Sequence, residues 1–350
     1  MVNPTPGSLH NRPVLLPAVP ATPLLTVANL RVTLNTARGP ADALRGIDLQ
    51  LERGAALGLI GESGCGKSMT AMAIMGLLPA GAAVSGSIVL SGRELVGLDD
   101  AAMCALRGNR IGMVFQEPMT ALNPLHTVGD QIAEPLRLHR RMARGAARAE
   151  ALRLLERVRL PQAAQRLDAY PHQLSGGQRQ RVTIAMALAC GPDLLIADEP
   201  TTALDVSIQA EILDLLHELV KESGMALLLI SHDLGVMARV AARLLVMYGG
   251  TVVESGPTGE VFAQLAHPYT RGLFAARPQL GAPRVDGRKP RLATIPGRVP
   301  ELVDMPAGCP FADRCGWVVG ACRTAPPAPV VVGPAHAVRC IRVGESGAAE

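Results

Sequence analysis

Three short runs of the sequence carry residues that could bind and cleave a phosphate chain, and the first is GESGCGKS at 61–68. It fits the pattern G-x-x-x-x-G-K-[ST], in which glycines turn backbone N–H groups toward phosphate oxygens and the following helix adds its dipole. Lys67 would reach the β- and γ-phosphates, and Ser68 would ligate Mg²⁺. The run and the residue after it predict a nucleoside triphosphate site made of Gly61, Glu62, Ser63, Gly64, Cys65, Gly66, Lys67, Ser68 and Met69.

Acidic residues close the second run, LLIADEP at 194–200. Four apolar residues before an acidic pair are typical of a buried strand, and ligands of open α/β sheets lie at such strand ends. Asp198 suits a Mg²⁺ contact, and Glu199 can polarise a water for in-line attack on the γ-phosphate. His232 ends the next apolar run, ALLLISHD, in the same way, although a lone histidine is usually structural.

The third run, LSGGQ at 174–178, is a second glycine-rich loop that leads into a helical pattern. Ser175, Gly176 and Gly177 would form another anion-binding helix terminus. One domain has no evident need of two such anion-binding sites for a single triphosphate. The run therefore raises the question of which phosphate it holds.

Alternating strands and helices must position these three runs. Residues 25–60 show the alternation of strands, a helix is expected at 69–78, and residues 125–170 are helical and rich in arginine. A strand at 194–200, a helix around 206–222 and a strand at 226–233 follow. This order predicts an α/β fold with a parallel sheet covered on both faces.

Length and composition suggest one large domain and a smaller one. The chain has 350 residues, and its 48% apolar content is ample for a core. Six prolines fall in residues 1–23, and the composition changes again after about residue 260, where prolines become frequent and long apolar runs become rare. We expect a flexible tail at 1–23, a nucleotide-binding domain at 24–260 with a helical subdomain at about 117–175, and a Pro- and Cys-rich extension at 261–350.

Charge and hydropathy bear on where the chain works. Residues 69–92 carry no charge, and such a length could span a membrane. Pro79, Gly81 and Gly86 interrupt the run, so a buried helix, a turn and a strand are expected instead. The proline-rich start does not resemble a secretory leader. We expect a soluble, cytosolic chain, and its net charge of +4 gives little reason to expect nucleic acid as the main partner.

The order of these motifs resembles that of the ATP-binding cassette (ABC) family: GESGCGKS, the glutamine of VFQEP (Gln116), LSGGQ, LLIADEP, TALD at 202–205 and the histidine of SHD. In that family two P-loop nucleotide domains pack head to tail, and the LSGGQ of one closes on ATP held by the other. The resemblance implies that the partner's nucleotide is gripped by Leu174, Ser175, Gly176, Gly177 and Gln178. It makes Asp205 the D-loop residue.

The same resemblance assigns roles at the strand ends. It implies that Glu199 is the catalytic carboxylate and that His232 contacts the γ-phosphate. It also implies that Gln116 links Mg²⁺, held with Ser68 and Asp198, to the membrane partner.

Four further runs resemble the oligopeptide/dipeptide importer subfamily, with its D-type ATPase subunit as the closer match. They are VFQEPMTALNP, VMYGGTVVESGP, HPYTRGL and LATIPGRVPELVDMPAGCPFADRC. The resemblance implies an ATPase that couples ATP and Mg²⁺ to peptide uptake, bound peripherally at the cytoplasmic face of the inner membrane. Its partners would be a second ATPase subunit (an F-type paralogue or a second copy), two transmembrane permeases and an external solute-binding protein.

One departure from the family pattern concerns adenine. Residues 24–60 contain no Phe, Tyr or Trp, and Leu34 stands where the family often has Phe. Adenine would then be held by aliphatic contact, and the lost stacking would cost on the order of 1 kcal/mol.

Four of the seven cysteines crowd the extension: Cys309, Cys315, Cys322 and Cys340. Disulfides are not expected in a reducing cytosol, whereas four thiolates can hold a [4Fe–4S] cluster or a structural Zn²⁺. Lack of a C-x₂-C pair weakens the zinc interpretation, and unligated thiols are the third possibility. Arg314, Arg323 and Arg339 each adjoin a cysteine and could offset the charge of such a site.

Two rival functions follow from the same motifs. Related transporter subunits serve nickel, opines and other small solutes, and no residue of an ATPase subunit touches the cargo. A soluble cassette protein acting on DNA or ribosomes would usually show paired cassettes or a long coiled-coil insertion, and this chain has neither. LSGGQ and its neighbouring motifs argue against other P-loop enzymes such as kinases.

Overall fold

The computed structural model describes residues 23–202, 204–277 and 293–344. Nearly all of the expected tail at 1–23 therefore lies outside the described residues. The buried apolar runs form one sheet, whose strands are β3 (Ala56–Ile60), β6 (Ile111–Val114), β7 (Leu194–Asp198), β8 (Ala226–Ile230), β9 (Arg243–Tyr248), β10 (Thr251–Pro257), β11 (Val330–Gly333) and β12 (His336–Val338).

The centre of this sheet is parallel. Its strand order is β11-β12-β10-β9-β3-β8-β7-β6, and the five strands from β9 to β6 pair in parallel. Every residue of β7 and β8 is buried, as expected for strands covered on both faces. The predicted parallel sheet is confirmed here.

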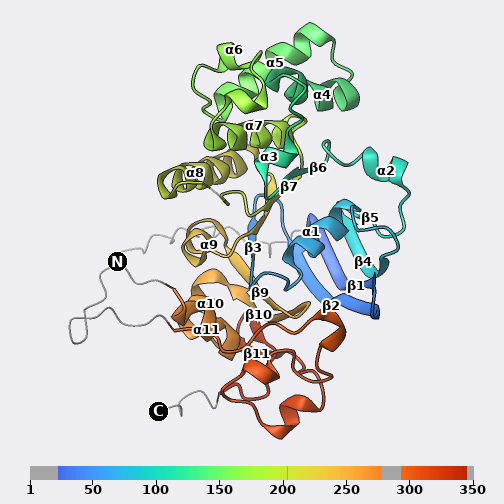
Figure 1. Cartoon of the computed structure of the whole chain (residues 1–350), viewed down its shortest axis with the longest axis vertical. Coiled ribbons are helices and arrows are strands. Elements are labelled where there is room, and N and C mark those ends of the chain that lie inside the picture. Colours follow the sequence, from blue (N-terminus) through green and yellow to red (C-terminus); the bar gives the residue numbers. More distant parts are fainter. Residues whose placement is uncertain (1–22, 203, 278–292, 345–350) are drawn as a thin grey trace, which may run out of the picture.

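One edge of the sheet is antiparallel, so the prediction is wrong there. Gly249 and Gly250, both at positive φ, form a two-residue turn between β9 and β10, and such a turn can join only antiparallel strands. The extension then adds β12 and β11 beyond β10. Residues 330–338 thus continue the main sheet, which ties the extension to it (Figure 1).

A second, antiparallel sheet is formed by β1 (Leu25–Thr36), β2 (Gly39–Leu51), β4 (Ala83–Leu90) and β5 (Arg93–Glu94), in the order β2-β1-β4-β5. The uncharged run at 69–92 becomes most of α1 (Lys67–Met75), a turn and β4, as expected. In the described part of the chain, none of the helices combines the length and the apolar character needed to cross a bilayer.

The remaining helices divide into two groups. Those toward one end of the molecule in Figure 1 lie within the range 117–175 of the expected helical subdomain or directly follow it. They are α3 (Pro118–Ala121), α4 (Val128–Arg140), α5 (Arg144–Arg157), α6 (Ala163–Arg166) and α7 (Gly176–Leu188). The others are α2 (Asp100–Cys104), α8 (Val206–Ser223), α9 (Leu234–Val240), α10 (Thr258–Gln264) and α11 (Pro268–Ala275), with short 3₁₀ turns at Leu302–Asp304, Ala312–Arg314 and Gly320–Arg323.

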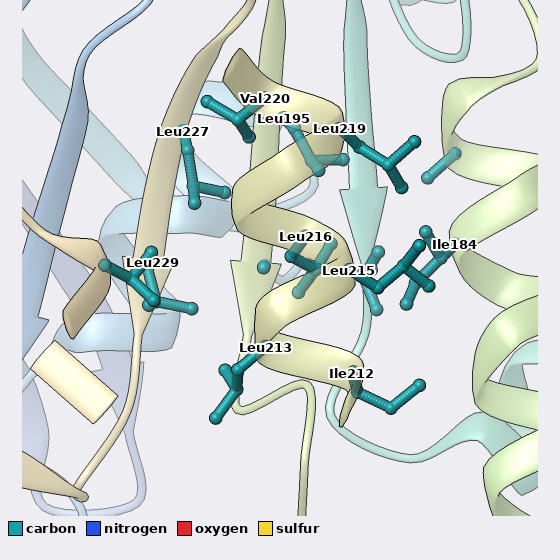
Figure 2. Close-up of a cluster of buried hydrophobic side chains, with 14 of the residues drawn as sticks. Ile184, Leu195, Ile212, Leu213, Leu215, Leu216, Leu219, Val220, Leu227 and Leu229 are labelled. Atoms are coloured by element: carbon teal, nitrogen blue, oxygen red, sulfur yellow. The ribbon is translucent and has the colours of Figure 1, made fainter. Parts of the chain in front are cut away.

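Helix α8 shows how the sheet is covered. Its buried side chains lie between the strands β7 and β8 and the neighbouring helix α7. Figure 2 shows this for Leu216 of α8, which lies between Leu227 of β8 and Ile184 of α7. Burial of each such leucine or isoleucine contributes about 1.5–3 kcal/mol. This packing holds the ends of β7 and β8 in place, where the predicted chemical residues lie.

Candidate active site

The phosphate loop at 61–68 joins the end of β3 to the start of α1. Gly61 has no room for a side chain, because a Cβ there would lie 2.3 Å from the carbonyl oxygen of Met247. Lys67 is 6% exposed, and its Nζ donates to the carbonyl oxygens of Gly61 at 2.8 Å and Glu62 at 3.1 Å. The lysine charge is thereby held over the loop.

Asp198 ends β7 beside this loop and is 5% exposed. Burial raises the pKa of its carboxyl, while a hydrogen bond from Ser68 and the charge of Lys67 act in the opposite direction. Its Oδ1 atom is buried and has no hydrogen-bond partner in the described structure. A buried carboxylate oxygen without a partner, next to a hydroxyl, suits a hard cation such as Mg²⁺.

Glu199 lies at the centre of a cluster of polar side chains. Its Oε2 accepts hydrogen bonds from Gln116 Nε2 at 3.3 Å and Thr202 Oγ1 at 3.0 Å. His232 Nδ1 lies 3.4 Å from the same oxygen. The Glu199 side chain is 17% exposed, so water can reach a carboxylate whose orientation is set by its neighbours.

The topology explains why these residues meet. Gln116, Glu199 and His232 follow the carboxyl ends of β6, β7 and β8, which are adjacent parallel strands. Glu199 also has a φ of 45°, a left-handed conformation that is unusual for any residue but glycine, asparagine or aspartate. Such conformations cost free energy and are found at functional sites.

The LSGGQ residues lie elsewhere in the chain's fold. Ser175 is the N-cap of α7: its Oγ accepts from the Gln178 N–H at 3.4 Å, and Gln178 Oε1 accepts from the Ser175 N–H at 3.1 Å. Leu174 is buried, whereas Ser175 and Gly176 are exposed. Helix α7 packs against α3, α4 and α5, and Figure 1 shows it apart from α1 and the phosphate loop. Asp205 is the exposed N-cap residue of α8.

The sequence did not predict the contacts that Thr202 and Arg314 make in the site. Thr202 belongs to the TALD run, but its hydrogen bond to Glu199 depends on the left-handed turn between them. Arg314, in the extension, pairs with Glu62 of the phosphate loop. No local pattern could indicate a contact across 252 residues.

The four cysteines of the extension line one small cavity together with His267, Phe311 and Trp317. Burial, with the neighbouring thiols as a smaller cause, raises the pKa of Cys309 to about 11. Nevertheless, the described residues contain no group of three or more His, Cys, Asp or Glu side chains placed to hold a metal ion. The described side chains therefore do not form the predicted metal site as they stand, although all four cysteines line the same cavity.

The neighbouring arginines differ from expectation as well. Arg314 pairs with Glu62, and Arg323 pairs with Asp313. The positive charges that were expected to offset cysteine thiolates are thus paired with carboxylates instead.

Comparison with known families agrees with the geometry. Residues 44–202 match the model of the ABC transporter family, and residues 253–322 match that of the oligopeptide/dipeptide transporter C-terminal region. A Brucella melitensis protein named as a peptide import ATP-binding protein is 51% identical over 334 residues, which cover 93% of this chain and 99% of that protein. The chain belongs to the ABC family of transporter ATPases.

Other relatives place this ABC ATPase similarly. The oligopeptide transport ATP-binding protein OppD of Haemophilus influenzae is 47% identical, over 87% of this chain and 93% of that protein. Among solved structures, the dimeric, post-hydrolysis state of the cassette MJ0796 bound to ADP and Pi aligns with a TM-score of 0.61 and 31% identity, over 67% of this chain and 98% of that one. The α/β ABC fold predicted from the motifs is confirmed, and an ABC ATPase uses ATP and Mg²⁺.

Proposed function

We propose that this ABC ATPase powers the uptake of di- or oligopeptides by a membrane importer. The observation that carries the proposal is the match of residues 253–322 to the oligopeptide/dipeptide transporter C-terminal region, which lies outside the ATPase motifs common to all cassettes. The Brucella melitensis relative supports it, because the similarity extends over nearly the full length of both chains.

Glu199 is the proposed general base. Its carboxylate accepts a proton from the water that attacks the γ-phosphate, and Gln116 and Thr202 orient it through their hydrogen bonds. His232, beside the same oxygen, contacts the γ-phosphate. Lys67 and the N–H groups of the loop bind the phosphates. Ser68, Asp198 and Gln116 would hold Mg²⁺, which neutralises charge on the phosphates.

LSGGQ serves a second subunit in this proposal. Ser175 and Gly176 are exposed at the start of α7, which presents its N-terminal N–H groups and positive dipole end to an anion. Since this terminus lies apart from the phosphate loop of its own chain, we assign it, with Asp205, to the nucleotide of a partner ATPase. The partner is an F-type paralogue or a second copy.

The proposed setting is the cytoplasmic face of the membrane, beneath two permeases fed by an external solute-binding protein. The proposed division of the chain is an ATPase domain at 24–260 with a helical subdomain at about 117–175, followed by the extension at 261–350. Leu34, half-buried in β1, is the proposed aliphatic contact for adenine.

An affinity pull-down from detergent-solubilised membranes tests the assignment. The bait is the Glu199→Gln chain with ATP and Mg²⁺, which should hold the closed assembly, and the matched control is the same bait without nucleotide. We expect two permeases and a second ATPase, and the ligand of the associated binding protein then identifies the cargo. Recovery of only ribosomal or DNA-associated partners would contradict the transporter role, whereas a nickel- or opine-binding protein would contradict peptide as the cargo.

For the extension we propose a [4Fe–4S] cluster held by the four cysteines. All four line one cavity. In a [4Fe–4S] cluster each thiolate binds a different iron, whereas a single Zn²⁺ binds all four sulfurs at a Zn–S distance of about 2.3 Å. A cluster therefore fits cysteine sulfurs that lie farther apart than a zinc site allows. Its role would be structural, and ligation would release protons from thiols whose pKa burial has raised. Anaerobic purification with iron, sulfide and zinc analysis tests this; absence of all three elements would rule out a metal here.

A further inference from the structure

An ion pair joins the extension to the phosphate loop. Arg314 Nη1 donates to Glu62 Oε2 at 2.5 Å, and Arg314 Nη2 donates to Glu62 Oε1 at 3.0 Å. The two bonds form a bidentate pair, which fixes geometry as well as charge. Glu62 is the second residue of GESGCGKS. The extension therefore contacts the ATP-binding loop directly.

A second contact fixes the backbone of the same loop residue. The Glu62 N–H donates to the hydroxyl of Tyr269 at 2.7 Å. Tyr269 is fully buried in α11 and packs edge-on against Tyr248, with ring centroids 4.7 Å apart. Phe311 of the extension packs on both tyrosines. Both the side chain and the main chain of Glu62 are thus held from outside the loop.

Arg314 itself is fixed on every side. Its side chain is 5% exposed, and its Nε donates to the Pro296 carbonyl oxygen at 2.8 Å. Nη1 also donates to the Tyr248 hydroxyl at 3.3 Å, and the guanidinium carbon lies 5.7 Å from the centre of that ring. Gly297, at a φ of 72°, passes so close that a Cβ there would lie 3.3 Å from the Arg314 Cγ. The guanidinium is a rigid anchor that pairs with a carboxylate of the phosphate loop.

We propose that Arg314 is a positioning residue for ATP binding: it holds the phosphate loop in the nucleotide-competent conformation and so makes ATP affinity depend on the extension. A loop that is ordered before binding does not lose that conformational freedom when ATP binds, so the affinity is higher. Lys67 shares in the effect, because its Nζ donates to the carbonyl oxygen of Glu62 itself.

The same anchor connects ATP to the cysteine cavity. Arg314 ends the 3₁₀ turn Ala312–Arg314, and Cys315 follows it directly. Phe311, Ala312 and Cys315 all line the cavity that the four cysteines share. The inference rests on ATP binding by the chain and holds whatever occupies the cavity or passes through the transporter.

The test measures affinity for a non-hydrolysable ATP analogue with Mg²⁺ by calorimetry, on the full chain. Arg314→Met, which keeps the length and loses both bonds to Glu62, should bind roughly tenfold more weakly, or about 1.4 kcal/mol. Arg314→Lys should recover part of the loss, because it keeps the charge without the fork. The matched control is Arg323→Met, which removes an exposed ion pair to Asp313 in the same extension and should bind as the wild type does.

A variant of Glu62, the partner in the phosphate loop, tests the same ion pair if Arg314→Met does not fold. Glu62→Gln weakens the same pair without disturbing the packing of the extension, and it should also weaken binding. If the two residues act as one unit, the double variant will bind no more weakly than the worse single variant. In the assembled transporter, KM for ATP should rise while kcat stays near that of the wild type.

Two results would overturn the proposal. One is unchanged affinity in folded Arg314→Met and in Glu62→Gln, which would make the pair a structural link only. The other is tighter binding, which would mean that the pair restrains the loop in a non-binding conformation. Neither result bears on the importer assignment, whose test is the identity of the membrane partners.

Discussion

At the scale of single residues, the geometry around Glu199 explains how one carboxylate is aimed. Gln116, Thr202 and His232 all approach its Oε2 atom, and the backbone at Glu199 is left-handed. The sequence alone placed Glu199 and His232 at strand ends, because apolar runs stop there. It could not predict the contribution of Thr202, because a contact between residues 199 and 202 depends on the conformation of the turn.

Thr202→Val tests this aiming contact. Valine keeps the shape and loses the hydroxyl, so Glu199 gains a less defined orientation and an unpaired neighbour. Removal of one such hydrogen bond costs about 0.5–1.5 kcal/mol, and hydrolysis by the assembled transporter should fall roughly three- to tenfold with ATP affinity unchanged. Thr202→Ser is the control and should retain most activity. Equal hydrolysis in wild type and Thr202→Val would show that Thr202 does not orient the base.

Asp198 should destabilise the chain when Mg²⁺ is absent. Its raised pKa means that burial penalises the charged form, so above the pKa of the unfolded carboxyl the native state is less stable than with a neutral side chain. Asp198→Asn should therefore raise Tm without nucleotide and abolish the increase in Tm that Mg²⁺ with ATP gives to the wild type. Thermal unfolding with and without Mg²⁺-ATP measures both. A lower Tm for the nucleotide-free variant would contradict this account.

At the scale of elements, the start of α7 depends on its close approach to α8. A Cβ on Gly177 would lie 2.8 Å from Ile208 Cγ2. Gly177→Ala should push the two helices apart, lower stability by about 1–3 kcal/mol and displace the exposed LSGGQ terminus. Gly145→Ala in α5 is a matched control, because open space surrounds that position and alanine favours a helix. Calorimetric unfolding compares them; equal stability would show that the contact yields without cost.

Some helices and strands could be predicted from their own sequences, whereas the pairing of others could not. The strands β3, β7 and β8 are continuous apolar runs, and the helix and strand in the uncharged run 69–92 were recognised from Pro79, Gly81 and Gly86. The pairing of β12 with β10 was not predicted. It depends on a buried contact between His336 Nε2 and Glu254 Oε1 at 2.8 Å, between residues 82 positions apart, and no local periodicity encodes such a pair.

At the scale of the whole molecule, the extension is held to the ATPase by buried polar groups, and this makes its stability depend on pH. His267, the N-cap residue of α11, donates its backbone N–H to Glu254 Oε2 of the ATPase domain at 2.9 Å, and its Nδ1 accepts from the Tyr269 N–H at 3.0 Å. Burial lowers its pKa to about 3, from the 6.5 of a free histidine. Between these values the unfolded chain binds a proton that the native chain does not, so stability falls as pH falls from about 6.5 toward 3.

The expected slope for this one group is at most about 1.4 kcal/mol per pH unit. His267→Asn keeps an N-cap side chain and removes the titration, so its Tm should change less than that of the wild type between pH 7 and pH 4.5. Parallel pH dependence in the two proteins would show that His267 does not control acid sensitivity.

We propose above all that Glu199 is the base of an ATPase coupled to transport. The most direct measurement is ATP hydrolysis by the transporter assembled with its permeases, comparing wild type with Glu199→Gln at saturating ATP and Mg²⁺. We predict retained ATP binding with turnover lowered by about 10²–10⁴-fold, the range typical of a lost general base. Hydrolysis by Glu199→Gln at a near-normal rate would contradict the claim.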